Sequence, residues 1–186
     1  MKTKITNILL CLSISLFMIA GSLNAQKINF SDQQSELIIL ENSYTILRAT
    51  NVISEVDYTE VKSPLGIFTM INTEAYGYSM DIGDPRVPVM KKIIEIPLEG
   101  DFQVNILNET YQEFSLAEIG IFHKLMPTQA PVSKSIENPE DIKFDYNPGI
   151  YNSNDYLYTQ QIKVIPLGIM RGVRLARLEI YPVQYN

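Results

Sequence analysis

Apolar and polar side chains alternate along much of the chain. In residues 52–59, Val56 and Tyr58 share one phase, while Asp57 and Thr59 share the other. A period of two places successive side chains on opposite faces of an extended chain, so the pattern predicts half-buried strands. The same alternation, or a run rich in β-branched and aromatic residues, predicts further strands at 36–41, 43–49, 65–71, 89–96, 102–106, 112–125, 156–164 and 172–181.

Prolines and glycines mark the expected ends of these strands. Pro97, Pro127, Pro166 and Pro182 each follow an apolar run, and proline cannot donate a hydrogen bond to a strand ladder. Breaks such as Gly83-Asp84-Pro85 indicate turns. After residue 25, no segment predicts a helix longer than two turns. Many short strands separated by turns predict an all-β fold, a jelly-roll-like sandwich of two sheets.

One connection, residues 127–153, is much longer than the others. It contains Pro127, Pro131, Pro139 and Pro148 and few apolar pairs. A connection of this length in a small domain is usually functional or disordered. We therefore expect it to carry function or to lack fixed structure.

Residues 1–25 have the pattern of a secretory signal peptide. Lys2 and Lys4 give a positive start, residues 8–20 are apolar, and Ala25 supplies a small residue before the cut. The apolar run is shorter than the about 20 residues that a membrane-spanning helix needs. We expect cleavage after Ala25, a mature domain of residues 26–186, and export to the periplasm, the cell surface or the medium, with no membrane attachment after cleavage.

Cleavage would change the charge and the chemistry of the chain. Lys2, Lys4 and Cys11, the single cysteine, leave with the signal, so 13 basic residues face 21 acidic ones and the net charge moves from −6 to −8. The mature domain would then have no disulfide or thiolate. Its acidic surface would repel nucleic acid and anionic lipid, so neither is an expected partner.

The pattern gives little sign of catalysis. His123, the single histidine, alternates with Ile121 and Leu125, so we interpret it as packed in the core or at a sheet edge. A zinc site needs several His or Cys ligands, and the acids Asp81 and Asp84 indicate a solvated turn rather than a calcium site. We expect no cofactor and no metal. An enzyme that uses paired carboxylates stays an alternative because the chain has 21 acids, but no pair stands out.

Two further patterns have both a structural and a functional interpretation. Asn108-Glu109-Thr110 matches a glycosylation triplet, but its place at a strand end favours a turn. Arg171, Arg174 and Arg177 lie on the last expected strand. We interpret them as a charged strand face or as protection of a sheet edge, with docking to an acidic partner as the alternative.

Three segments, in this order, carry a resemblance to a known family. A Gly-x-Pro-x-x-Pro turn precedes the strand that ends at Ile96, a basic residue precedes Glu-Asn-Pro in the long connection, and an Arg-Gly strand leads to a Pro-x-Gln-Tyr-Asn ending. This set resembles the propeptides of gingipain-type cysteine proteases, peptidase family C25 of Bacteroidetes, over residues 50–186. The motif positions are Gly83, Pro85, Pro88, Pro97, Asn138, Pro139, Arg171, Gly172, Pro182 and Tyr185.

The resemblance implies a jelly-roll-like sandwich that keeps a C-terminal protease latent and assists its folding. Propeptides of this family continue with a further strand beyond the position of Asn186 and are followed by the catalytic domain. We therefore expect a domain that is truncated relative to the family and lacks its last strand. The chain would be a fragment of a longer precursor, a truncated product or a free-standing inhibitor. It would not be an enzyme itself, although the full precursor would be a cysteine-type endopeptidase.

The resemblance also implies a mechanism. Gingipains cleave after Arg or Lys, and a propeptide can block such a protease by placing a basic side chain in the primary specificity pocket, where an acid pairs with it. The matching position is Lys134, between Ser133 and Ser135, and it would also be the first processing site. Pro131 stiffens the approach and lowers the entropy lost on docking. The expected partner is a cognate gingipain-like protease domain, in the same precursor or in trans, with its Arg or Lys preference left open.

A second function stays open at this point. The chain would then be a secreted sandwich that binds a glycan or a cell-surface adhesin. This alternative requires exposed aromatic side chains on one face, for which Tyr151, Tyr156 and Tyr158 are the candidates. Their other interpretation is packing within the core or between strands.

Overall fold

The structure is a computed structural model of the chain, and it describes residues 26–43, 45–135, 138 and 142–186. The expected signal peptide, residues 1–25, lies outside the described residues. Within them the chain forms strands and one short helix. These are β1 (Gln26–Asn29), β2 (Glu36–Asn42), β3 (Leu47–Val52), β4 (Glu55–Ser63), β5 (Gly66–Asn72), β6 (Gly77–Tyr78), β7 (Pro88–Ile96), α2 (Pro148–Tyr151), β8 (Ile162–Met170) and β9 (Val173–Ile180).

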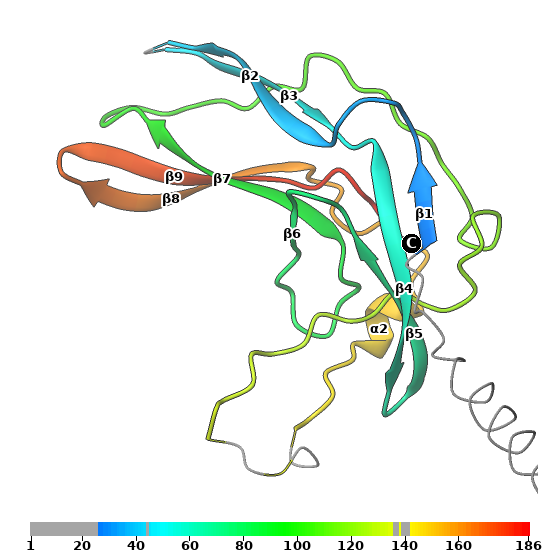
Figure 1. The fold of residues 1–186 in the computed structure, drawn as a ribbon. Helices are drawn as coiled ribbons and strands as arrows, with labels where there is room; N and C mark the ends of the chain where they lie inside the picture. Colours follow the sequence, from blue (N-terminus) through cyan, green and yellow to red (C-terminus); the bar gives the residue numbers. More distant parts are fainter. Residues whose placement is uncertain (1–25, 44, 136–137, 139–141) are drawn as a thin grey trace, which may run out of the picture.

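The strands form three antiparallel sheets. Their orders are β1-β4-β5, β2-β3 and β6-β7-β9-β8. In Figure 1 the β2–β3 hairpin lies above the four-stranded sheet, and the β1-β4-β5 sheet crosses at one end of both. The prediction of an all-β fold is confirmed, and the set of antiparallel sheets is consistent with a sandwich.

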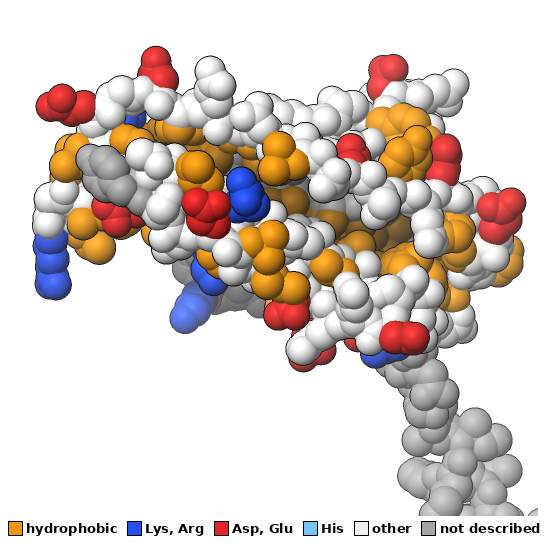
Figure 2. Space-filling model, turned by 90° about the horizontal axis from the view of Figure 1, so that it is seen from above, with side chains coloured by type: hydrophobic (Ala, Val, Ile, Leu, Met, Phe, Trp, Pro, Cys, Tyr) orange, Lys and Arg blue, Asp and Glu red, His pale blue; other side chains and the backbone are white. Residues whose placement is uncertain are grey.

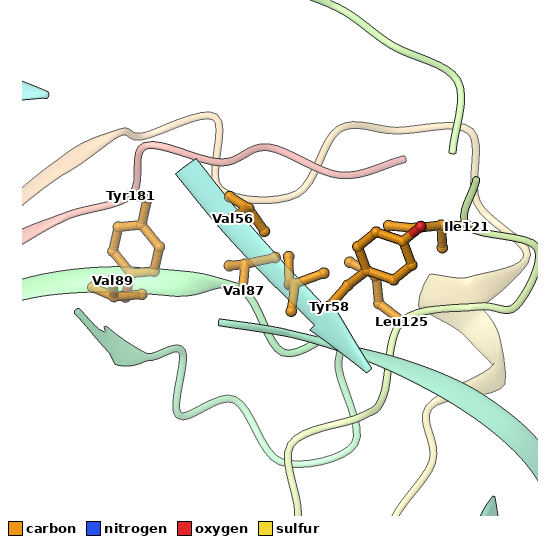
Figure 3. Close-up of a cluster of buried hydrophobic side chains, with 8 residues drawn as sticks. Val56, Tyr58, Val87, Val89, Ile121, Leu125 and Tyr181 are labelled. Atoms are coloured by element: carbon orange, nitrogen blue, oxygen red, sulfur yellow. The ribbon is translucent and has the colours of Figure 1, made fainter. Parts of the chain in front are cut away.

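The core lies where these sheets meet. Its buried members come from β4, β5, the residues around the start of β7, the segment 121–125 and the end of the chain (Figure 3): Val56, Tyr58, Ile71, Val87, Val89, Ile121, Leu125 and Tyr181. Each large aliphatic side chain buried here contributes about 1.5–3 kcal/mol. In β4 the period-two prediction is confirmed, because Val56 and Tyr58 are buried while Asp57 between them is partly exposed.

Two predicted strands are wrong. Residues 101–115 have no regular structure, and residues 116–120 form a turn. The expected inner face of 102–106 is exposed, with Phe102 at 37 %, Val104 at 45 % and Ile106 at 49 %. Alternation alone does not make a strand, because the backbone also needs a neighbouring strand to accept and donate its hydrogen bonds. No described strand forms a ladder with residues 102–106, and the second segment makes only an isolated bridge, between Leu125 and Thr69 of β5.

Other predicted strands are shifted. The expected strand 43–49 contains the turn of the β2–β3 hairpin, where the Ser43 amide donates to the Ile46 carbonyl over 2.9 Å. The expected strand 156–164 begins only at Ile162, because Tyr158 has a φ of +61°. Such a left-handed residue interrupts an extended strand.

The prolines mark strand ends only in part. Pro97 follows the last residue of β7, and Pro182 follows soon after β9. Pro166 instead lies inside β8, next to the bulge between Pro166 and Gly168. An edge strand tolerates proline at such a place because one of its sides needs no donor. Pro127 ends no strand but forms an isolated bridge with Pro85.

The arginine prediction is also corrected. Arg171 and Gly172 form the two-residue turn of the β8–β9 hairpin, both with positive φ, as such tight turns require. Arg174 and Arg177 lie on β9, between β7 and β8. They therefore do not protect a sheet edge. Arg177 donates from Nε to the buried carboxylate of Glu179 over 2.7 Å.

An open groove of about 2720 Å³ separates the β2–β3 hairpin and residues 101–116 from the faces of β7, β8 and β9. Figure 2, seen from above, shows hydrophobic side chains gathered along a hollow across this face. Within the described residues, no helix has the length and apolar character to cross a membrane.

Candidate functional site

The turn at residues 83–86, here called the base turn, holds the outgoing limb of the long connection. The Gly83 amide donates to the Thr128 carbonyl over 2.8 Å, and the Thr128 amide donates to the Asp84 carbonyl over 2.9 Å. The Arg86 amide donates to the Met126 carbonyl over 2.9 Å. Pro85 and Pro127 are fully buried beside this ladder. The start of the connection is therefore fixed like a short strand pair.

The same turn holds the returning limb. The Asn147 amide donates to the Gly83 carbonyl over 2.9 Å, and the Asn147 side chain donates from Nδ2 to Asp84 Oδ1 over 2.7 Å. Gly83 has a φ of +86°, and a Cβ there would lie 3.3 Å from the Asn147 nitrogen. Both the left-handed backbone and the close approach favour glycine.

An aromatic cluster supports the returning limb from β5. The buried ring of Phe68 lies 5.8 Å from Phe144, 6.1 Å from Tyr146 and 6.4 Å from Tyr151. The rings of Tyr146 and Tyr151 stack at 4.5 Å. The Tyr151 hydroxyl donates to the Leu125 carbonyl over 2.6 Å, and burial raises the pKa of Tyr151 above its ordinary value. Contacts between aromatic rings stabilise a fold beyond the effect of burying their apolar surface. Side chains therefore hold this limb in addition to its backbone hydrogen bonds.

Gln129 and Asp145, here called the neck, join the two limbs. Gln129 donates from Nε2 to the Asp145 carbonyl over 2.9 Å, and its Oε1 accepts from the Asp145 amide over 2.9 Å. The side chain of Gln129 therefore makes both bonds that an opposing strand residue would make. The segment between residues 128 and 146 is here called the projecting loop, and its described parts, 128–135, 138 and 142–146, include the two limbs that meet at the base turn.

Beyond the neck, the described part of the projecting loop is exposed. Residues 131–135, 138 and 142–143 have no buried side chain, and Figure 1 shows both limbs running away from the sheets. Lys134 lies in a turn between two serines, whose hydroxyls are 2.7 Å apart. The Ser135 amide also donates to Ser133 Oγ over 3.3 Å. Lys134 is thus exposed in the outer part of a loop whose two limbs are held at the base turn and the neck.

A comparison with known families bears on this arrangement. Residues 31–186 match the model of the family Propeptide_C25. The chain belongs to the Propeptide_C25 family. The resemblance drawn from the three sequence motifs is therefore confirmed.

Individual relatives agree. The chain is 32% identical over 179 residues to Lys-gingipain and to Lys-gingipain W83 of Porphyromonas gingivalis, a match that spans 96% of this chain and 10% of each relative. It is similar to the structure of gingipain K from Porphyromonas gingivalis, described for its zymogenic latency, with a TM-score of 0.77, 32% identity and 88% of each chain covered. The complex of the RgpB pro- and mature domains shares the fold, at a TM-score of 0.67 and 17% identity, with 83% and 76% covered.

Apart from Asn138 and Pro139, the remaining motif positions of this Propeptide_C25 chain lie outside the projecting loop. Pro88 begins β7 and is fully buried, and the Tyr185 carbonyl accepts from the Leu157 amide over 2.8 Å. Arg171 and Gly172 form the turn of the β8–β9 hairpin, in the same sheet as β7. Asn138 is exposed, and Pro139 lies outside the described residues. Most of these positions therefore shape the scaffold, and among the site residues expected from the sequence Lys134 is the basic one in the loop.

The expectation for His123 is wrong. Its side chain is 37 % exposed, and Nε2 lies 3.4 Å from Glu60 Oε1, which is more exposed still. Its expected strand does not form, so alternation did not carry it inward. Asp84, expected in a solvated turn, binds Asn147 instead. The residues that the structure describes contain no group of three or more His, Cys, Asp or Glu placed to hold a metal.

The tyrosines do not form one exposed face. Tyr158 stacks on the buried Tyr181 at 4.6 Å, and burial raises its pKa. Tyr151 belongs to the aromatic cluster under the loop. Tyr156 is 42 % exposed and is the exception. The aromatic platform that the glycan-binding alternative requires is absent from these three positions.

Sequence reasoning missed the residues that hold the loop. Asp84, Gln129, Asp145 and Asn147 make the contacts, yet polar residues near prolines are common in loops. A weak signal exists in the two turn motifs, Gly83-Asp84-Pro85 and Asn147-Pro148-Gly149. Nothing in either motif shows that it pairs with the other.

Proposed function

We propose that this chain is the N-terminal propeptide of a secreted gingipain-like cysteine endopeptidase, and that it keeps the protease latent and assists its folding. Membership of the Propeptide_C25 family supports this. So do the subjects of the two similar structures, which are the latency of a zymogen and a complex of pro- and mature domains. The chain spans about a tenth of the length of its Lys-gingipain relatives, a share that suits one segment of a precursor.

The proposed inhibitor is Lys134. Its ammonium enters the primary specificity pocket of the cognate protease and pairs there with a carboxylate, as a substrate lysine would. The supporting observation is an exposed lysine on a loop whose foot is fixed by the base turn, the aromatic cluster and the neck. A loop that is ordered before binding loses less conformational entropy on docking. Residues 26–186 contain no cysteine, so in this proposal the catalytic thiol belongs to the protease domain.

The boundaries and location follow from the same proposal. Residues 1–25 direct export and are removed, and residues 26–186 form the propeptide domain. The partner is the cognate protease domain, and the protein acts in the periplasm, at the cell surface or outside the cell. A protease that matures after export needs its inhibitor in the same compartment, which a shared precursor provides.

Inhibition assays with matched lysine variants test this function. The purified exported chain is titrated against the mature cognate protease domain, with Lys134→Ala and Lys143→Ala compared with the wild type. Lys143 is the control because it lies in the same loop with its side chain 87% exposed and pairs with Asp145 only at 3.5 Å. Loss of one partner of a buried charge pair costs about 2–5 kcal/mol, or roughly 30- to 4000-fold in the inhibition constant. The proposal fails if Lys134→Ala inhibits as well as the wild type.

A further inference from the structure

In the described part of the projecting loop, the hydrogen bonds that join its two limbs are all made at the neck. Three hydrogen bonds join the limbs, and Asp145 takes part in all of them. Two are the bonds to the Gln129 side chain at 2.9 Å, and the third runs from the Ala130 amide to Asp145 Oδ2 over 3.4 Å. Gln129 Nε2 also donates to the Pro127 carbonyl over 3.0 Å. The Gln129 side chain thus binds both limbs at once.

We propose that Gln129 is the positioning residue that makes the projecting loop an inhibitor instead of a substrate. This inference rests on the proposed function, in which Lys134 occupies the specificity pocket. A lysine in that pocket presents the Lys134–Ser135 peptide bond to the protease. Hydrolysis would add water across that bond, with the carboxylate forming on Lys134 and the free amine on Ser135. A successful inhibitor must bind this way and yet be cut slowly.

The neck slows cutting by opposing the local opening of the loop. Proteolysis of a folded chain requires a segment to leave its native contacts, so its rate follows the population of the open form. The base turn holds the two limbs together at residues 127–128 and 147. The neck adds a second link between them at residues 129 and 145, so the segment that can move freely is shorter. Removal of the Gln129 bonds leaves the backbone amide and carbonyl of Asp145 without their partner and lengthens the free segment that carries Lys134.

The test uses the full exported chain and two substitutions of Gln129. Gln129→Ala removes the side chain, and Gln129→Met keeps its length but cannot make the two bonds to Asp145. Gln112→Ala is the control because Gln112 is an exposed glutamine outside the loop. Each variant is treated with a trace of an unrelated lysine-specific endopeptidase, and the cuts after Lys134 and Lys92 are followed by mass spectrometry. Lys92 lies inside β7, between the two ends of its pairing with β9, so its cut reports global unfolding.

We expect the ratio of the Lys134 cut to the Lys92 cut to rise about tenfold in both Gln129 variants and to stay unchanged in the control, given the cost of two lost hydrogen bonds. With the cognate protease, both variants should inhibit at first and then release activity faster than the wild type. An unchanged ratio, or an equal rise at both lysines, overturns the inference. These results are separate from the proposed function, which fails on Lys134→Ala inhibition whatever the cutting ratio.

Discussion

The side chain of Asn147 donates a 2.7 Å hydrogen bond to the carboxylate of Asp84, a residue 63 positions earlier in the chain. This contact joins the end of the projecting loop to the turn that also holds its beginning. The Gly-x-Pro turn of the family motif is therefore more than a connection between β6 and β7. It binds both ends of the loop that carries Lys134.

Asp84→Ala is expected to weaken inhibition while the sheets stay folded. The change removes the acceptor for Asn147 Nδ2, and an unsatisfied, partly buried amide costs about 1–3 kcal/mol. The backbone bonds of the base turn to Thr128 and Asn147 remain, so the loss should appear mainly as a weaker inhibition constant, by roughly 5- to 150-fold. Inhibition titration and circular dichroism measure the two effects. Asp101→Ala, an exposed acid outside the loop, is the control, and equal inhibition by both variants would contradict the expectation.

Gly83→Ala should destabilise the domain more than Gly100→Ala. The two glycines have nearly the same φ, +86° and +87°, but a Cβ at Gly100 meets nothing within 4 Å, whereas one at Gly83 lies 3.3 Å from the Asn147 nitrogen. Both variants pay about 1–2 kcal/mol for a left-handed alanine. The difference between them therefore isolates the contact with the returning limb.

Urea unfolding of the two glycine variants gives this difference directly. Gly83→Ala should also raise the rate of cutting after Lys134, because the strained base turn releases Asn147. Gly100→Ala should leave that rate at the wild-type value. Equal losses of stability in the two variants would show that the approach of Asn147 imposes no constraint.

The sequence pattern predicted the parts of the fold in which local rules and tertiary context agree. In β4, alternation places Val56 and Tyr58 in the core, and the Pro97 break ends β7. The same alternation failed at Phe102 and Val104 because no described strand lies beside them to complete a ladder. Period-two patterning reports which face a strand would bury, but the presence of a partner depends on the rest of the chain.

In the candidate site too, some residues could be predicted from the sequence and others could not. Lys134 could be singled out because it is a basic residue in a long, proline-rich connection that matches a family motif. Gln129 and Asp145 could not, because their two bonds depend on the backbone positions of residues 16 apart in the chain. A glutamine that replaces a strand partner has no sequence pattern of its own. The residue proposed to inhibit the protease could therefore be predicted from the sequence, while those proposed to position it required coordinates.

Alkaline pH should destabilise the domain through Tyr76. Its hydroxyl donates to Asn51 Oδ1 over 2.8 Å and to the Val52 carbonyl over 2.9 Å, and so ties the turn after β5 to β3. Burial raises the pKa of Tyr76 to about 12, whereas an unfolded tyrosine ionises near pH 10. Above pH 10 the unfolded state therefore binds fewer protons than the folded state. Stability is fully present below pH 10 and falls as the pH rises towards 12.

Urea unfolding at pH 8, 10 and 11 measures this loss, with Tyr76→Phe as the matched variant. The variant lacks the ionising hydroxyl, so it should start less stable at pH 8, because it leaves Asn51 without a donor, and should lose less stability than the wild type from pH 10 to 11. Other buried tyrosines contribute to the decline in both proteins and cancel in the comparison. Parallel losses over that interval would show that Tyr76 ionises in the folded chain as readily as in the unfolded one.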